Sequence, residues 1–294
     1  MSSFTKIKNN DKEQYLINIV QKLEDKSSSD IEKTQNYNNI AKYIVEVLDS
    51  KYNRGFSMRK RKESLCFIND KLSFKIIELV TRDLEVSENK KLDEKILSAL
   101  VNVSNCNTNT LNKLNNNIFV NLIFTKIDFH LKNKSFDVLD EFVGFLATIN
   151  IKLNAELQEK SINKIINIFL EFNQNEHTNH YYFLHKTFIA FINSSNIPVC
   201  MNKIYENGND IISKIKSILE KNELFTSILY KERIDEIYKL MIQAFCNFVA
   251  LKPNFVKIMR EENVMEIVSS QSMKKLMPNH CEFIINCLNK ELPE

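Results

Sequence analysis

Apolar residues recur every three or four positions along almost the whole chain. In the stretch KEQYLINIVQKLED this spacing is made by Leu16, Ile19, Val20 and Leu23. The same pattern returns in NYNNIAKYIVEVLDS, in LSFKIIELVTRDL and in nearly every later segment. A repeat of 3.6 residues places apolar side chains on one face of a helix, whereas a half-buried strand would alternate with a period of two. The sequence therefore predicts an all-α fold.

Glycine and proline are scarce, which narrows the fold further. The 294 residues include only 3 Gly and 4 Pro, while 44% of them are hydrophobic. Hairpin turns and phosphate-binding loops depend on glycine, and average usage is about 7% for Gly and about 5% for Pro. We therefore expect neither a β-sandwich nor a nucleotide-binding α/β fold, but a helical chain with enough apolar surface for a large core.

Three segments share one internal design, in which a short helical pattern meets a single Asn or Gly and a longer pattern follows. The central residues are Asn117, Gly208 and Asn263. Asn and Gly tolerate the left-handed backbone conformation better than other residues. Each of the three is therefore predicted to form a sharp corner between two helices.

A further helix recurs as ILSALVNVS, EFVGFLATI, TFIAFINSS and MIQAFCNFV. Aligning these segments places Asn102, Thr148, Asn193 and Asn247 in register, at steps of 46 (148−102), 45 (193−148) and 54 (247−193). A repeat a little above forty residues, built from one short and two longer helices, is typical of stacked helical repeats. We predict a right-handed superhelical solenoid, with a helical N-terminal cap over residues 1–56 and four to five units over residues 57–294.

At this level the chain resembles the armadillo repeat family over residues 57–294. In that family the third helix of each unit lines a concave groove, where an Asn binds the backbone of an extended peptide through its amide. The resemblance implies partner-binding roles for Asn102, Asn193 and Asn247, while Thr148 departs from the pattern. Because the chain is rich in Asn, composition is the other explanation of this register.

The importin-alpha adaptors are armadillo proteins in which a Trp precedes the groove Asn by four positions. The corresponding residues here are Ser98, Gly144, Ile189 and Gln243, and the chain contains no Trp. The pockets that stack on Lys side chains in that family are therefore missing in that form. Phe145, Phe191 and Phe245 lie nearby, and their apolar neighbours predict that they belong to the core.

A basic stretch, KYNRGFSMRKRKESL, contains Arg54, Arg59, Lys60, Arg61 and Lys62. It has three interpretations: a localisation signal read by another protein, a segment like the autoinhibitory one that precedes the importin-alpha repeats, or a solvated helix face. The chain as a whole carries a formal net charge of +3, from 40 basic and 37 acidic residues. Such balance gives no long-range field for nucleic acid, so we expect no direct nucleic-acid binding.

The sequence predicts no catalytic, metal or cofactor site and no small-molecule substrate. His177, His180 and His185 form one group and His280, Cys281 and Cys287 another, but neither matches a zinc-ligand spacing. The six Cys include no CxxC pair, and neither a signal peptide nor an apolar run of 18 residues is present. We therefore expect a protein of the cytoplasm, the nucleus or both, without a membrane partner.

These patterns together favour a non-enzymatic protein-binding adaptor or scaffold that holds an extended peptide or a helix on the concave face of an armadillo-like array. A nuclear transport adaptor is one form of this prediction. The alternatives are an armadillo-type Hsp70 nucleotide exchange factor and a constitutive scaffold subunit of a larger complex.

Overall fold

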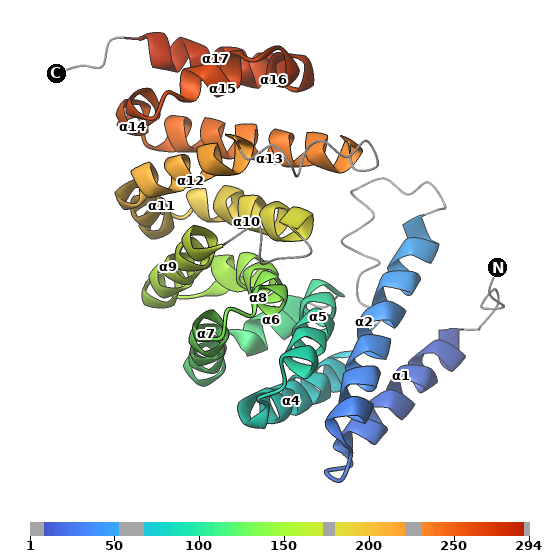
Figure 1. The fold of residues 1–294 in the computed structure, drawn as a ribbon. Helices are drawn as coiled ribbons and strands as arrows, with labels where there is room; N and C mark the ends of the chain where they lie inside the picture. The colour runs from blue at the N-terminus through green and yellow to red at the C-terminus, as the bar shows by residue number, and fades with distance from the viewer. Residues whose placement is uncertain (1–8, 53–67, 107, 173–179, 221–230, 291–294) are drawn as a thin grey trace. The chain divides into compact units, whose positions relative to one another are not determined.

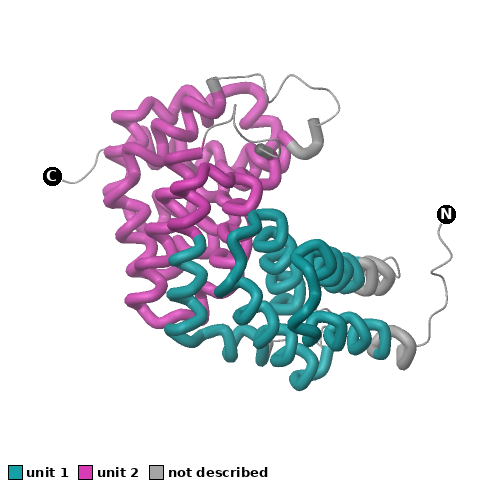
Figure 2. The backbone as a smooth tube through the Cα atoms, turned by 60° about the horizontal axis from the view of Figure 1, so that its bottom comes forward, with its two compact units in different colours: residues 1–126 teal, residues 127–294 magenta. Residues whose placement is uncertain are grey.

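A computed structural model of the chain describes residues 9–52, 68–106, 108–172, 180–220 and 231–290 (Figure 1). Within these ranges the regular elements are sixteen α-helices and one 3₁₀-helix, with no strand. The predicted all-α fold class is confirmed. The chain divides into two compact units, residues 1–126 and residues 127–294 (Figure 2).

The first unit is built from two layers of helices. Helix α2 packs along α5, while α1 packs on α2 and α4, and α6 packs on α4 and α5. The bounds are α1 (Asn9–Glu24), α2 (Asp30–Tyr52), α4 (Asp70–Val86), α5 (Lys90–Cys106) and α6 (Thr108–Leu114), followed by α7 (Asn117–Lys132), which ends in the second unit.

The second unit repeats this layering. Helices α8, α10, α13 and α17 pack in that order in one layer, while α9 packs on α11 and α12, and α12 on α14, in the other. The bounds are α8 (Phe136–Ile149), η2 (Asn150–Lys152), α9 (Ala155–Glu171), α10 (His180–Ser195), α11 (Pro198–Glu206), α12 (Gly208–Glu220), α13 (Lys231–Leu251), α14 (Phe255–Glu261), α15 (Val264–Ser269), α16 (Gln271–Leu276) and α17 (Pro278–Asn289).

The apolar stripes read from the sequence form the core of both units. Leu16, Ile19, Val20 and Leu23 of α1 are all at most 4% exposed. The three aromatic residues expected in the core, Phe145, Phe191 and Phe245, are fully buried. That prediction is confirmed.

The predicted corners from a short helix to a longer one are present at α6–α7 and α11–α12, but the prediction is wrong for the third corner, where α14 has 7 residues and α15 has 6. Only Asn263, with φ 58°, has the predicted left-handed backbone; the prediction is wrong for Asn117 and Gly208. Asn117 already belongs to α7, whose first turn is capped by the side chain of Asn116, which accepts a hydrogen bond from the Phe119 amide.

Gly208 is required for space rather than for backbone freedom. A Cβ atom at this position would lie 2.8 Å from Cδ1 of Ile258 and 3.0 Å from Cζ of Phe255. These two residues belong to the next short helix, α14. The glycine therefore fits the close packing of α12 on α14, because a Cβ atom here would force the side chains of Ile258 and Phe255 to shift.

A cationic side chain from a neighbouring helix caps the carboxyl end of several helices. Arg82 donates to the carbonyl of Leu23 at the end of α1, at 2.7 Å, and Lys126 donates to the carbonyl of Ser87 just after α4. In the second unit, Lys214 donates to the carbonyl of Phe172 just after α9, at 2.6 Å. Such contacts satisfy carbonyls that lack an intrahelical partner and complement the negative end of the helix dipole.

The sequence positions of these three cations follow the predicted repeat spacing. The apolar patterns alone had not revealed this regularity. Arg82 and Lys126 are 44 residues apart (126−82), and Lys214 follows after 88 residues (214−126), which is twice that step. The cap therefore recurs at a spacing of 44 residues or a multiple of it.

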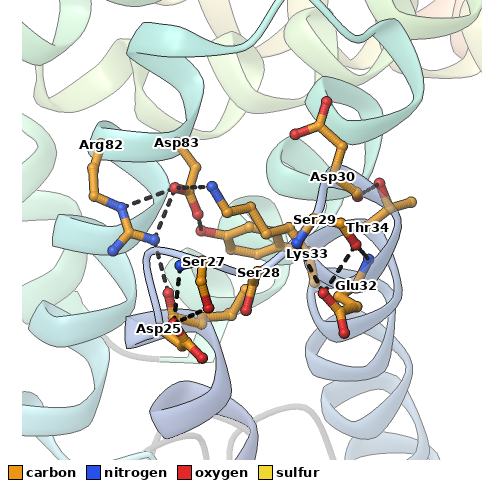
Figure 3. Close-up of polar contacts among 12 residues, drawn as sticks. Asp25, Ser27, Ser28, Ser29, Asp30, Glu32, Lys33, Thr34, Arg82 and Asp83 are labelled. Carbon is orange, nitrogen blue, oxygen red and sulfur yellow. Dashed lines mark hydrogen bonds and ion pairs between the residues drawn. The ribbon is translucent and has the colours of Figure 1, made fainter.

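A buried carboxylate joins three helices of the first unit (Figure 3). Asp83 of α4, which is 1% exposed, accepts a hydrogen bond from the Tyr37 hydroxyl of α2 at 2.9 Å and pairs with Lys33 at 3.2 Å and with Arg82 at 2.8 Å. Arg82 also reaches the end of α1 through Leu23. The buried carboxylate is thus paired with two cations, and it also accepts a hydrogen bond from a neutral phenol.

The predicted boundary between a cap at 1–56 and an array at 57–294 lies within residues 53–67, outside the described residues, and stays a prediction. The two compact units divide the chain at a different place, after Lys126.

We predict that Asp83→Asn lowers the free energy of unfolding by about 3 kcal/mol, because Lys33 and Arg82 would be left without their buried counter-charge. Urea unfolding followed by circular dichroism measures this loss. Glu88→Gln removes an exposed carboxylate of the same unit and should change stability by less than about 0.5 kcal/mol. Similar losses for both variants would contradict the role assigned to Asp83.

Tyr37 gives the first unit an expected alkaline pH dependence. Burial, reinforced by the negative charge of Asp83, raises the pKa of Tyr37 well above its ordinary value. The folded chain therefore holds this proton more tightly than the unfolded chain. The resulting stability is complete below about pH 10, the ordinary pKa of a tyrosine, and is lost as pH rises above it. The stability difference between wild type and Tyr37→Phe should shrink as pH rises above about 10, the ordinary pKa of a tyrosine; a constant difference would contradict this.

Candidate partner-binding surface

The residues aligned in the third helices of the second unit lie on adjacent helices, because α8 packs on α10 and α10 on α13. Side chains four and seven positions apart share one face of a helix. The exposed or half-exposed residues of that face include Thr148, Tyr182, Asn193, Lys239, Gln243 and Asn247. We call these six residues the third-helix face.

The register residues differ in what their side chains do. Asn193 is exposed on α10. Asn247 of α13 donates its amide to the Ser195 hydroxyl at 3.1 Å and to the Ile192 carbonyl at 3.5 Å. The Thr148 hydroxyl donates to the carbonyl of Gly144 at 2.9 Å. Asn247 therefore ties α13 to α10, and Asn193 is the register residue of this unit with its amide most accessible to a partner.

Asn102 lies on α5 and is half-buried. It belongs to the first unit, so its alignment with the other three register residues stays a prediction. The basic stretch with Arg54, Arg59, Lys60, Arg61 and Lys62 lies outside the described residues.

A lysine of α10 crosses to α8 at Gly144, four residues before Thr148. Gly144 has no side chain, and the Lys186 Cδ atom lies 3.2 Å from where a Cβ would be. The Lys186 ammonium pairs with Asp140 at 3.4 Å and with Glu141 at 2.9 Å. The glycine thus lets the lysine of α10 lie across α8, and the two acids hold its charge within the protein.

A second polar contact joins the amino-terminal halves of α10 and α13. The Tyr181 hydroxyl donates to one oxygen of Glu236 at 2.6 Å, and Nε2 of His185 lies 3.2 Å from the other. The hydrogen bond from Tyr181 lowers the pKa of Glu236, and the contact with His185 acts in the same direction. His185, considered above as a metal ligand, therefore contacts a carboxylate; His177 lies outside the described residues.

The opposite layer presents a different surface, on which charges are paired with one another. Lys203 bridges Glu159 at 3.2 Å and Glu206 at 2.8 Å, and Lys160 pairs with Glu156 at 2.7 Å. Exposed pairs of this kind contribute little to stability but neutralise the surface. The third-helix face presents three carboxamides, the ammonium of Lys239, the hydroxyl of Thr148 and the ring of Tyr182. Carboxamides suit contact with the main chain of another protein.

The thiols of Cys200 and Cys246 are unsuited to nucleophilic chemistry. Burial raises the pKa of the Cys246 thiol to about 12, with further contributions from Cys281 and Cys287, and burial also raises the pKa of Cys200. The thiolate is the reactive form, so these thiols are inert near neutral pH. Among the described residues no three His, Cys, Asp or Glu side chains are grouped so as to hold a metal ion.

Within the described part of the chain, no helix combines the length and the apolar character needed to cross a bilayer.

We predict that truncation to Ala lowers stability at Asn247 but leaves it almost unchanged at Asn193. Asn247→Ala should lower the free energy of unfolding by about 1 kcal/mol, because the hydrogen bonds that tie α13 to α10 are lost. Asn193→Ala should stay within about 0.5 kcal/mol of wild type. Urea unfolding of both variants tests this, and a larger loss for Asn193→Ala would reverse the assignment.

Comparison with known proteins identifies a similar fold but no family. No protein-family model matches the chain, and no curated protein matches it. A crystal structure of an engineered protein from the Northeast Structural Genomics Consortium is similar, with a TM-score of 0.57 and 12% sequence identity, over 93% of this chain and 97% of that chain. At this identity the likeness concerns the fold alone.

Proposed function

We propose that this chain is a non-enzymatic protein-binding adaptor or scaffold of the cytoplasm or nucleus, and that the third-helix face of the second unit is its binding surface. The observation that carries the proposal is that α10 and α13, which pack side by side, expose the carboxamides of Asn193 and Gln243.

Stacked helical layers favour this function on physical grounds. Each repeat buries its apolar stripe against its neighbours. The solvent-facing side of the third helix in each repeat is therefore available for recognition. The resemblance to armadillo repeats extends the proposal to a right-handed superhelix whose third helices line a concave groove. An extended peptide is the partner that suits rows of carboxamides, because each amide can both donate to and accept from a peptide main chain.

The alternatives given by the sequence share this fold and differ in the partner. A transport adaptor would bind an import carrier, an exchange factor would bind the Hsp70 ATPase domain, and a scaffold subunit would keep one constitutive complex. The identity of the bound protein therefore separates them.

We test the proposal by quantitative affinity purification of the tagged full chain from its own cells. A variant that combines Asn193→Ala, Lys239→Ala and Gln243→Ala should recover at least about fivefold less of the main partner than wild type does. This loss corresponds to about 1 kcal/mol of binding free energy. These three positions are exposed, so circular dichroism should show an unchanged fold.

The matched control carries Asn167→Ala and Asn209→Ala, at exposed positions of α9 and α12 in the opposite layer. It should recover the partner as wild type does. Equal recovery by wild type and the triple variant, or loss only in the control, would overturn the assignment of the binding surface.

A further inference from the structure

A buried polar cluster joins the two layers of the second unit, where η2 contacts α9 and α10. Its members are Asn150 of η2, Gln158 of α9, Ser194 of α10 and Cys200 of α11. The side chains of Asn150, Ser194 and Cys200 are each at most 1% exposed, and Gln158 is half-buried. Bulk solvent therefore does not solvate the polar atoms of these three buried side chains.

Hydrogen bonds connect the members of the cluster to one another. The Asn150 amide nitrogen donates to Oγ of Ser194 at 2.9 Å and lies 3.5 Å from Sγ of Cys200. The Cys200 thiol donates to the carbonyl of Gln158 at 3.5 Å, and the Gln158 amide donates to the carbonyl of Asn150 at 3.2 Å. Because these contacts form a closed ring from Asn150 through Cys200 and Gln158, they hold the Asn150 side chain in one place.

The side-chain oxygen of Asn150 is the exception in this cluster. It is buried and accepts no hydrogen bond from any residue that the structure describes. A carboxamide oxygen has two lone pairs that accept hydrogen bonds. A buried polar atom without a partner costs free energy, so such atoms in folded proteins are nearly always bonded to protein or to ordered water. Oδ1 of Asn150 therefore needs a donor that the described residues do not supply.

We propose that Asn150 binds one internal water molecule, which donates to Oδ1 of Asn150 and accepts from the hydroxyl of Ser194. Oγ of Ser194 accepts its hydrogen bond from the Asn150 nitrogen, so the proton of the hydroxyl is available for a second bond. The nitrogen and Oδ1 belong to the same amide, which places Oδ1 and Ser194 close enough for one water to bridge them. A molecule that both donates and accepts fits this pair of groups, whereas a metal ion would meet the proton of Ser194.

Rotation of the amide by half a turn is the alternative arrangement. The oxygen would then accept from the Ser194 hydroxyl and the Cys200 thiol, which lie 2.9 Å and 3.5 Å from the position of the nitrogen. The nitrogen would take the place of Oδ1, where its protons need an acceptor. A water molecule accepts as well as it donates, so it satisfies either arrangement.

The bound water would become part of the contact between the two layers. Internal waters of this kind ordinarily make two to four hydrogen bonds to buried polar groups and are costly to remove. The cluster lies between the layers and shares no residue with the third-helix face. The inference therefore does not depend on the function proposed above, and neither failure implies the other.

A high-resolution crystal structure of the full chain is the first test. We expect one ordered water within about 3.0 Å of the Asn150 side chain and of Oγ of Ser194. An Asn150 amide with no water density within hydrogen-bonding distance, in either orientation, would overturn the proposal. This measurement uses wild type and so does not depend on how any variant folds.

The second test counts long-lived internal waters in solution by magnetic relaxation dispersion of water oxygen-17. Asn150→Leu replaces the amide by an apolar group with the same number of heavy atoms, and the variant should hold one internal water fewer than wild type. Asn167→Ala, at an exposed position of α9, is the control and should leave the number unchanged. Circular dichroism checks that both variants are folded. An unchanged number in folded Asn150→Leu, or an equal loss in the control, would contradict a water site at Asn150.

Discussion

Each helix of this chain buries one apolar stripe, and two layers of helices are needed to bury all of them. A single helix has no partner for its stripe, and a single layer would leave every stripe half exposed. In the second unit, Phe145, Phe191 and Phe245 occupy the same place in three successive helices of one layer and are fully buried against their neighbours. This burial fixes which side of each third helix faces solvent, and with it the position of every candidate binding residue.

Polar contacts then set the angles and ends of the helices that the apolar stripes bring together. The buried Asp83 holds α2 to α4 through Tyr37 and Lys33, and Arg82 connects the same carboxylate to the end of α1. Lys126 and Lys214 cap the ends of α4 and α9 in the same way, 44 residues (126−82) and 132 residues (214−82) after Arg82. A buried charge is costly unless it is fully paired, so such contacts tolerate few alternative packings. We infer that they contribute to specificity of packing more than to net stability.

The sequence predicted what depends on neighbours in the chain and missed what depends on distant ones. Helix class, the short helices before corners and the buried Phe residues follow from local periodicity, which one sequence contains. The backbone at Gly208 could not be predicted, because the reason for this glycine is contact with Phe255 and Ile258, about fifty residues later. The role of Asn247 was hidden for the same reason, since its partner Ser195 lies on another helix. Alignment placed these residues in register, but only packing shows which amides already have partners within the fold.

The third-helix face arises because a helix in a layer has one solvent-facing stripe. Its polar side chains are compatible with exposure when no partner is bound. The buried Phe145, Phe191 and Phe245 fix the rotation of α8, α10 and α13, so the opposite side of each helix faces solvent. Asn193 is exposed on that side, whereas the amide of Asn247 is already bonded to Ser195. Packing therefore decides which of the aligned residues can meet a partner.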